Sequence, residues 1–79
     1  MMKTLQVTIN SIDKVKSFVN TISKFDFDVD MVSGRYIIDA KSIMGIFSLD
    51  LSNPIDLIVH AEGAQLEQAL ASIQDYIVS

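Results

Sequence analysis

The stretch Lys41-Ser42-Ile43-Met44-Gly45-Ile46-Phe47-Ser48-Leu49 lies near the middle of this 79-residue chain. Serine before an apolar run is a preferred helix N-cap, so Ser42 is expected to begin a helix of about two turns. One face of so short a helix cannot bury all the apolar side chains here, which are Ile43, Met44, Ile46, Phe47, Leu49 and Leu51. Some of them must therefore be exposed, and exposed apolar clusters often mark partner-binding surfaces.

Four segments around this stretch alternate apolar and polar residues. They are residues 4–9, 27–31, 35–40 and 55–61. Such alternation is typical of strands with one buried face and one solvent-exposed face. Between the second and third segments, Ser33-Gly34-Arg35 is a turn signal, because glycine adopts positive φ without a Cβ clash. Residues 27–40 are therefore predicted to form a hairpin.

Two further segments have apolar residues at three- and four-residue spacing, which predicts amphipathic helices. The first follows Asn10 or Ser11, either of which can act as N-cap. Its apolar stripe is Ile12, Val15, Phe18, Val19, Ile22 and Phe25. The last follows Gly63, with the stripe Leu66, Ala69, Leu70, Ile73 and Ile77. The resulting order is β-α-β-β-α-β-α, and we expect one α+β domain over residues 1–79, in which helices cover one face of a four-stranded antiparallel sheet.

Composition excludes several classes of function. The chain has no cysteine, so disulfides and thiolate metal sites are excluded. Its net charge of −4 disfavours direct nucleic-acid binding. No signal peptide and no membrane-spanning apolar run is recognisable. We therefore expect a cytoplasmic protein that contacts neither nucleic acid nor membrane.

Four segments of the chain resemble the HPr family, the small phosphocarrier proteins of the bacterial sugar phosphotransferase system. The run from Lys41 to Leu49 resembles that family's Lys-Ser-Ile-Met-Gly-hydrophobic-Met-Ser-Leu. The others are Lys3-Thr4-Leu5-Gln6-Val7-Thr8, Ser23-Lys24-Phe25-Asp26 and Ala61-Glu62-Gly63-Ala64. The resemblance implies the family's open-faced β-sandwich, which has the same element order.

The chain departs from the family between Thr8 and Lys16. The family has Gly-Ile-His-Ala-Arg-Pro-Ala there, and its histidine carries phosphate. This chain reads Asn10-Ser11-Ile12-Asp13-Lys14-Val15-Lys16, about three residues shorter when the flanks are matched. Phosphoramidate formation needs an imidazole nitrogen, and the single histidine, His60, lies in the last predicted strand. We therefore expect no catalytic residue, no enzyme activity and no phosphocarrier activity.

The resemblance implies that Ser42 is a regulatory phosphorylation site and that Ile43, Met44 and Phe47 face protein partners. A helix N-cap that is never modified is the alternative for Ser42. Lys14 and Lys16 are candidates to replace the missing arginine near a phosphate, although lysine lacks the guanidinium fork. A solvated helix face explains both lysines equally well. Asp50, where the family commonly has glycine, adds a negative charge near this surface.

Three aspartates, Asp26, Asp28 and Asp30, begin like a calcium loop. Met31 and Ile37 stand where that loop needs its turn glycine and its bidentate glutamate, so a solvated strand face is preferred. Asp13 is better explained by the helix dipole than as an aspartyl-phosphate site. His60 has no second ligand of its kind, so we expect no metal site and no cofactor.

The resulting hypothesis is a regulatory binding protein similar to the HPr-like corepressor that also lacks the phosphocarrier histidine. Its partners would be an HPr serine kinase and a transcription regulator or phosphotransferase-system component. The alternatives are a divergent phosphocarrier and an unphosphorylated structural or interaction module.

Overall fold

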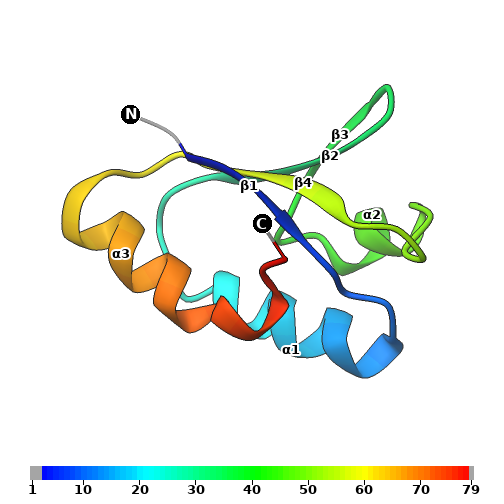
Figure 1. Cartoon of the computed structure of the whole chain (residues 1–79), viewed down its shortest axis with the longest axis horizontal. Helices are drawn as coiled ribbons and strands as arrows, with labels where there is room; N and C mark the ends of the chain where they lie inside the picture. Colours follow the sequence, from blue (N-terminus) through cyan, green and yellow to red (C-terminus); the bar gives the residue numbers. More distant parts are fainter. Residues whose placement is uncertain (1–2, 79) are drawn as a thin grey trace.

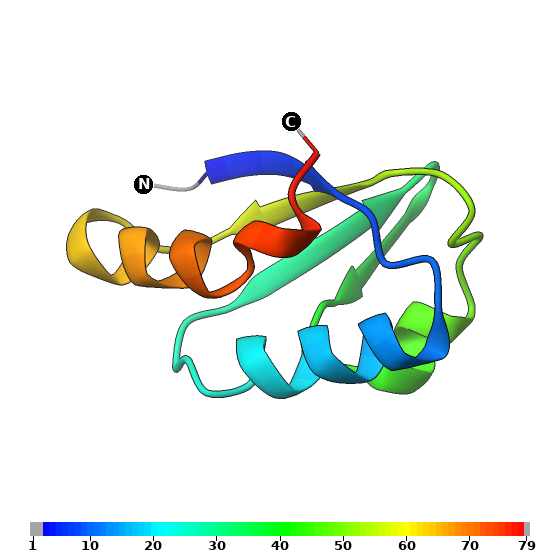
Figure 2. The same cartoon turned by 60° about the horizontal axis from the view of Figure 1, so that its bottom comes forward.

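The computed structural model describes residues 3–78 and confirms the predicted α+β order and sheet. The strands are β1 (Lys3–Val7), β2 (Val29–Ser33), β3 (Tyr36–Asp39) and β4 (Ile55–Val59). The helices are α1 (Ile12–Ile22), α2 (Ile43–Phe47) and α3 (Gly63–Ser72), followed by the 3₁₀ turn η1 (Gln74–Tyr76). All strand pairs are antiparallel, in the order β1-β4-β2-β3. The helices lie on one side of the sheet (Figures 1 and 2).

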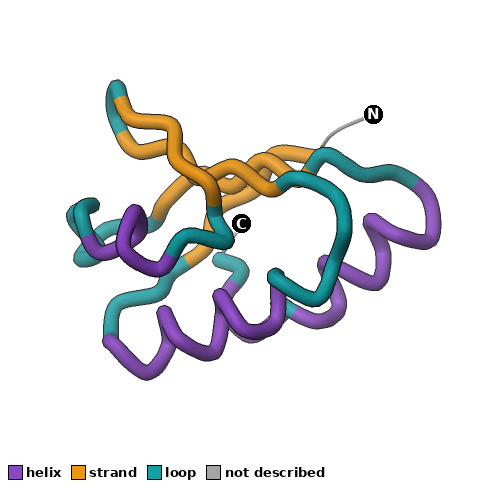
Figure 3. The backbone as a smooth tube through the Cα atoms, turned by 180° about the vertical axis from the view of Figure 1, so that it is seen from behind, coloured by secondary structure: helices purple, strands orange, loops and turns teal. Residues whose placement is uncertain are grey.

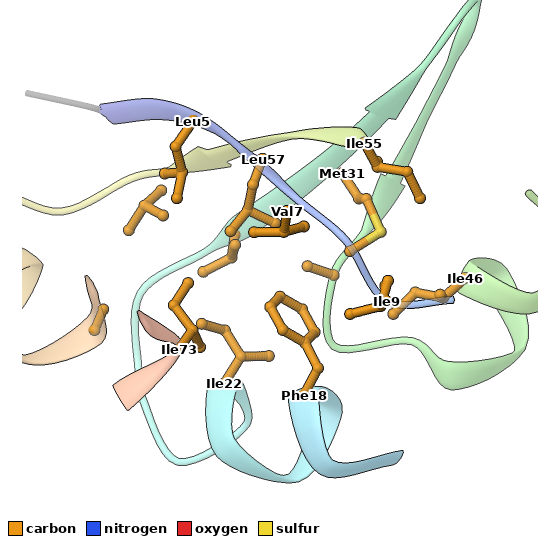
Figure 4. Close-up of a cluster of buried hydrophobic side chains, with 14 of the residues drawn as sticks. Leu5, Val7, Ile9, Phe18, Ile22, Met31, Ile46, Ile55, Leu57 and Ile73 are labelled. Atoms are coloured by element: carbon orange, nitrogen blue, oxygen red, sulfur yellow. The ribbon is translucent and has the colours of Figure 1, made fainter. Parts of the chain in front are cut away.

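The core fills the space between the sheet and the helices (Figure 4). Alternate strand residues point into it, as the two-residue period requires. The buried residues of the apolar face of α1 pack against them from the helix side. The fully buried large side chains are Phe18, Ile9, Ile22, Met31, Ile46, Leu57, Ile73, Val7, Val15, Val29 and Val59. Because these residues come from every layer, the core holds α1, α2 and the C-terminal segment against the sheet.

The β2–β3 hairpin turns at Gly34 and Arg35, which separate the paired residues Ser33 and Tyr36. Gly34 has φ +60°, where a Cβ would be strained, and Arg35 does not have positive φ. Glycine at the first of two central positions is typical of a type II′ turn, whose twist matches that of the strands. The hairpin tip extends away from the helices (Figures 1 and 3).

The prediction of a helix reaching Ile77 is wrong. α3 ends at Ser72, and Ile77 instead forms a bridge with Val7 of β1. The N–H of Thr8 donates to the Tyr76 carbonyl at 2.8 Å, and the N–H of Val78 donates to the Gln6 carbonyl at 2.9 Å. The C-terminal segment therefore satisfies backbone groups on the outer edge of β1, which a continued helix could not do.

Three smaller predictions also need correction. Ile12, at the first turn of α1, is 62% exposed rather than part of the buried stripe. Phe25 lies beyond the end of α1 and stacks on Phe27, with ring centroids 5.2 Å apart. Asp26 and Asp28 precede β2, so only Asp30 of the three aspartates is in a strand. In the described part of the chain, no helix is long and apolar enough to span a membrane.

Candidate functional site

A tight turn joins β3 to α2 and places Ser42 at its end. The backbone N–H of Ser42 donates to the Asp39 carbonyl at 3.0 Å. The side chain of Asp39 accepts a second bond, at 2.9 Å, from the N–H of Lys41. An aspartate that bonds its own backbone two residues on is a common turn device. The turn thus fixes the position from which α2 begins.

Ser42 is the N-cap of α2, as the sequence predicts. Its backbone is extended, with φ −97° and ψ 104°, and its hydroxyl accepts a hydrogen bond from the N–H of Gly45 at 3.2 Å. Its carbonyl accepts from the N–H of Ile46 at 3.0 Å, which closes the first helical turn. The residue as a whole is exposed. The hydroxyl therefore stabilises the helix start while remaining at the protein surface.

Gly45 allows this close approach. A Cβ on Gly45 would lie 3.2 Å from the Ser42 hydroxyl oxygen and 3.5 Å from the side chain of Ile38. The first of these distances is tighter than ordinary van der Waals contact. A Cβ at position 45 would therefore press on the Ser42 cap, whereas it would make only an ordinary contact with the Ile38 side chain.

The apolar side chains of α2 divide between core and surface. Ile46 is fully buried and Ile43 is half-buried. Met44 is 77% exposed and Phe47 is 39% exposed. The prediction that this segment has more apolar residues than it can bury is therefore confirmed. We call Ser42, Ile43, Met44 and Phe47 the Ser42 surface.

Lys41 anchors the Ser42 turn to the segment that follows α1. Its ammonium donates to the backbone carbonyl of Phe25 at 2.6 Å in a partly buried contact. Charged donors make stronger hydrogen bonds than neutral ones. The side chain of Lys41 thus ties the start of α2 to the segment that follows α1.

The two candidate lysines lie on α1, the neighbour of α2 in the helix layer (Figure 2). Lys14 donates from its ammonium to the side-chain oxygen of Asn10 at 3.2 Å. Both lysines are exposed, and in the described residues neither forms an ion pair or a hydrogen bond with Ser42.

Asp13 lies in the first turn of α1, where a negative charge interacts favourably with the helix dipole. Ser11, rather than Asn10, caps this helix by accepting from the Lys14 N–H at 3.1 Å.

Asp50, just after α2, is held in a local turn by Ser52. The Ser52 hydroxyl and N–H both donate to the same Asp50 oxygen, at 2.6 and 3.1 Å. These two bonds, the hydroxyl bond first, lower the pKa of Asp50 below its usual value. Asp50 is thus a negatively charged, exposed side chain in the loop that follows α2.

His60 pairs with Asp30, a contact that the sequence analysis missed. The imidazole Nε2 lies 2.8 Å from an Asp30 carboxylate oxygen, and both side chains are partly exposed. His60 was predicted to lie in the last strand, but β4 ends at Val59 and His60 lies just beyond it. The β2–β4 register, which pairs Asp30 with Ile58, was needed to bring the two side chains together. Among residues 3–78, no three His, Cys, Asp or Glu residues are grouped to hold a metal ion.

Comparison with known proteins agrees with this architecture. The family model described as "PTS HPr component phosphorylation site" matches residues 13–79. The chain is similar to HPr-C-His from Thermoanaerobacter tengcongensis, at 31% identity and TM-score 0.69 over 95% of this chain and 88% of the other. A phosphocarrier protein HPr from Bacillus anthracis str. Ames matches at 28% identity and TM-score 0.73, over 99% and 96% of the two chains.

The Bacillus subtilis catabolite repression containing protein Crh is also similar. It matches at 28% identity and TM-score 0.65, over 92% of this chain and 88% of its own. Its structure is described as a domain-swapped, intertwined dimer. The family match covers most of the sequence, and the solved structures reproduce the sheet with its helix layer. This chain therefore belongs to the HPr family of the phosphotransferase system.

Proposed function

We propose that this protein is a regulatory member of the HPr family that is phosphorylated at Ser42 and binds protein partners through Ile43, Met44 and Phe47. The observation that carries the proposal is the placement of an exposed hydroxyl and two exposed apolar side chains on one short helix. A partner can contact all of them from one direction. Apolar burial would supply most of the affinity, and the phosphate would select the modified form.

The modification step would use ATP and a serine kinase of the HPr-kinase type. The Ser42 oxygen would attack the terminal phosphorus of ATP, forming the new P–O bond as the bond to ADP breaks. The hydroxyl proton would pass to a base of the kinase. In the free protein the Ser42 hydrogen is available, since the oxygen accepts from the Gly45 N–H and the O–H donates to no other described residue. Phosphorylation can therefore proceed while the oxygen still accepts from that N–H.

The product would place a dianionic group at the surface of the Ser42 turn. Lys14 and Lys16 of the neighbouring helix α1 are exposed, and long lysine side chains can approach such a group. The carboxylates of Asp39 and Asp50 would repel this phosphate, because they lie just before and just after the segment that carries Ser42 and α2. We therefore expect the lysines to support partner binding by the phosphorylated form rather than to hold the phosphate rigidly.

Loss of the family's histidine phosphorylation is the second part of the proposal. The only histidine of the chain, His60, contacts Asp30 on the open face of the sheet. The segment that corresponds to the family's phosphocarrier loop leads into α1, in the helix layer on the other face. An imidazole on the open face cannot replace one at the start of α1, because a donor protein docked on the helix layer does not reach it.

A test of both parts uses two phosphate donors and a docking variant. Incubation with enzyme I and phosphoenolpyruvate should give no mass increase, under conditions that phosphorylate a true HPr completely. Transfer to any residue would support a divergent phosphocarrier instead. Met44→Asp should weaken binding to the HPr serine kinase, whereas Val78→Asp, an exposed apolar residue beside the opposite edge of the sheet, should leave it unchanged. Equal binding by both variants would remove Met44 from the docking surface.

A further inference from the structure

The two outer edges of the sheet differ in the groups that they leave unpaired. β1 pairs with β4 on one side, and the segment around Ile77 covers its other side through the bonds to Gln6 and Thr8. β3 pairs with β2 on one side only. Within residues 3–78, no strand pairs with the outer side of β3, and the one backbone bond to that side comes from the N–H of Ser42 to the Asp39 carbonyl. The sheet therefore has one closed edge and one open edge.

The strand register identifies which groups of β3 point outward. The N–H of Ala40 donates to the Val29 carbonyl at 2.8 Å, so residue 40 points toward β2. Backbone groups alternate in direction along an antiparallel strand. Tyr36 and Ile38 therefore bond inward, while the N–H and C=O of Ile37 and the N–H of Asp39 point outward. The carbonyl of Asp39 already accepts from the N–H of Ser42.

This open edge is short and ends in the charged Asp39, but it carries none of the other features that prevent strand addition. β3 contains no proline and no lysine, and its pairing with β2 is continuous. Natural edge strands are commonly blocked by such residues or by bulges. Tyr36 and Ile37 are 68% and 69% exposed. The hairpin tip also extends beyond the helix layer, so the edge is accessible there (Figures 1 and 3).

We propose that β3 pairs in antiparallel fashion with β3 of a second copy of this chain. Pairing centred on Ile37 places Ile37 beside its own copy. Arg35, in the turn directly before β3, then lies at the end of the pairing where Asp39 of the second copy ends its strand, and its long side chain can reach that carboxylate, twice by symmetry. The Ile37 N–H and C=O groups would form two backbone hydrogen bonds, and Tyr36 would pack beside Ile38 of the second copy.

Charge complementarity favours this register and favours a second copy of this chain as the partner strand. A shift of two residues keeps the outward groups opposed but separates both Arg35 side chains from their acidic partners. Within residues 3–78, Arg35 forms no ion pair, and Asp39 uses only one of its oxygens, for the Lys41 N–H. The antiparallel two-fold arrangement would join the sheets and keep both helix layers on the same side. The chains carry a net charge of −4 each, so general repulsion opposes association and the local pairs must offset it.

The interface is short, so the dimer should be weak and reversible. Sedimentation velocity of the full chain from about 10 μM to about 1 mM should show a concentration-dependent monomer–dimer equilibrium. Arg35→Asp and Asp39→Arg should each weaken the homodimer by about tenfold or more, because each variant opposes like charges twice. An equimolar mixture of the two variants should restore association, since the heterodimer again pairs opposite charges. Ile12→Ser, which removes a similarly exposed apolar residue from α1, should have no effect.

Circular dichroism identifies any variant that fails to fold. Asp39→Arg loses the bond to the Lys41 N–H; if it unfolds, Asp39→Asn keeps the acceptor oxygen and should still weaken the dimer. A wild-type chain that stays monomeric to about 1 mM would overturn the proposal. A dimer insensitive to Arg35→Asp, such as one formed by strand exchange, would overturn it as well. Neither result depends on phosphorylation of Ser42.

Discussion

The hydroxyl oxygen of Ser42 lies 3.2 Å from the N–H nitrogen of Gly45, and a Cβ on Gly45 would lie equally close to that oxygen. The two residues are thus interdependent: the serine satisfies a helix N–H that has no partner within α2, and the glycine leaves space for the serine. Any group attached to the Ser42 oxygen extends from a fixed point at the start of α2. This relationship links the stability of the short helix to the proposed regulatory site.

Ser42→Ala should lower the free energy of unfolding by about 1 kcal/mol, because the Gly45 N–H loses its acceptor. Chemical denaturation measures the change. Ser11→Ala removes the equivalent cap of α1, where the hydroxyl accepts from the Lys14 N–H at 3.1 Å, and should cost a similar amount. If Ser42→Ala is as stable as the wild type while Ser11→Ala is not, the Ser42 hydroxyl does not stabilise α2.

Truncation of two apolar residues two positions apart in α2 should have very different effects on the free energy of unfolding. Ile46→Ala should cost about 2–5 kcal/mol, since the side chain is fully buried and leaves a cavity. Met44→Ala should change stability by less than about 0.5 kcal/mol, because its side chain is mostly in solvent. Thermal unfolding of both proteins tests the difference. A large loss for Met44→Ala would place that side chain in the core instead of on the Ser42 surface.

Lys41→Met should destabilise the protein by about 1 kcal/mol, because the Phe25 carbonyl loses a charged donor at 2.6 Å in a partly buried place. Methionine retains most of the apolar stem, so the change isolates the loss of the ammonium. Lys24→Met, at an exposed position, provides the control and should be nearly neutral. Equal stability of the two variants would show that the Lys41 contact contributes nothing.

Asp50 should titrate below the usual aspartate pKa of about 3.9, because Ser52 donates two hydrogen bonds to its charged form. NMR titration of the Asp50 carboxyl measures this directly. Ser52→Ala removes the hydroxyl bond and should raise the pKa toward the usual value. Because the folded-state pKa is the lower one, any stabilisation is present above the unfolded pKa and is lost as pH falls through the folded pKa. An unchanged pKa in Ser52→Ala would contradict this cause.

Periodicity was enough to predict the sheet, the hairpin and the cap of α2, since each depends on local signals. The alternation that predicts β1 and β4, and the glycine at position 34 that predicts the hairpin turn, are each contained within a few residues of the sequence. The same reasoning extended the last helix to Ile77, because Leu66, Ala69, Leu70, Ile73 and Ile77 keep helical spacing. In the structure Ile77 pairs with Val7 instead. A contact between chain ends, which satisfies the edge of β1, cannot be recognised from a local pattern.

The local sequence predicted the exposure of apolar residues at the candidate site, but it did not predict the site's contacts with distant segments. An excess of apolar residues after Ser42 indicated exposure, and the structure identifies Met44 and Phe47 as the exposed ones and Ile46 as the buried one. The contact between Lys41 and the Phe25 carbonyl could not be foreseen, because it joins segments 16 residues apart through a side chain of many rotamers. The pairing of His60 with Asp30 likewise required the strand register.

The most direct test of the proposed regulatory function is the intact mass of the protein after incubation with an HPr serine kinase and ATP. Wild type and Ser11→Ala should each gain one phosphate, and Ser42→Ala should gain none. Ser11 is the matched control because it caps α1 as Ser42 caps α2. No gain by the wild type, in a reaction that phosphorylates a true HPr, would contradict the proposal and favour an unphosphorylated interaction module. A gain that persists in Ser42→Ala would contradict the assignment of the site.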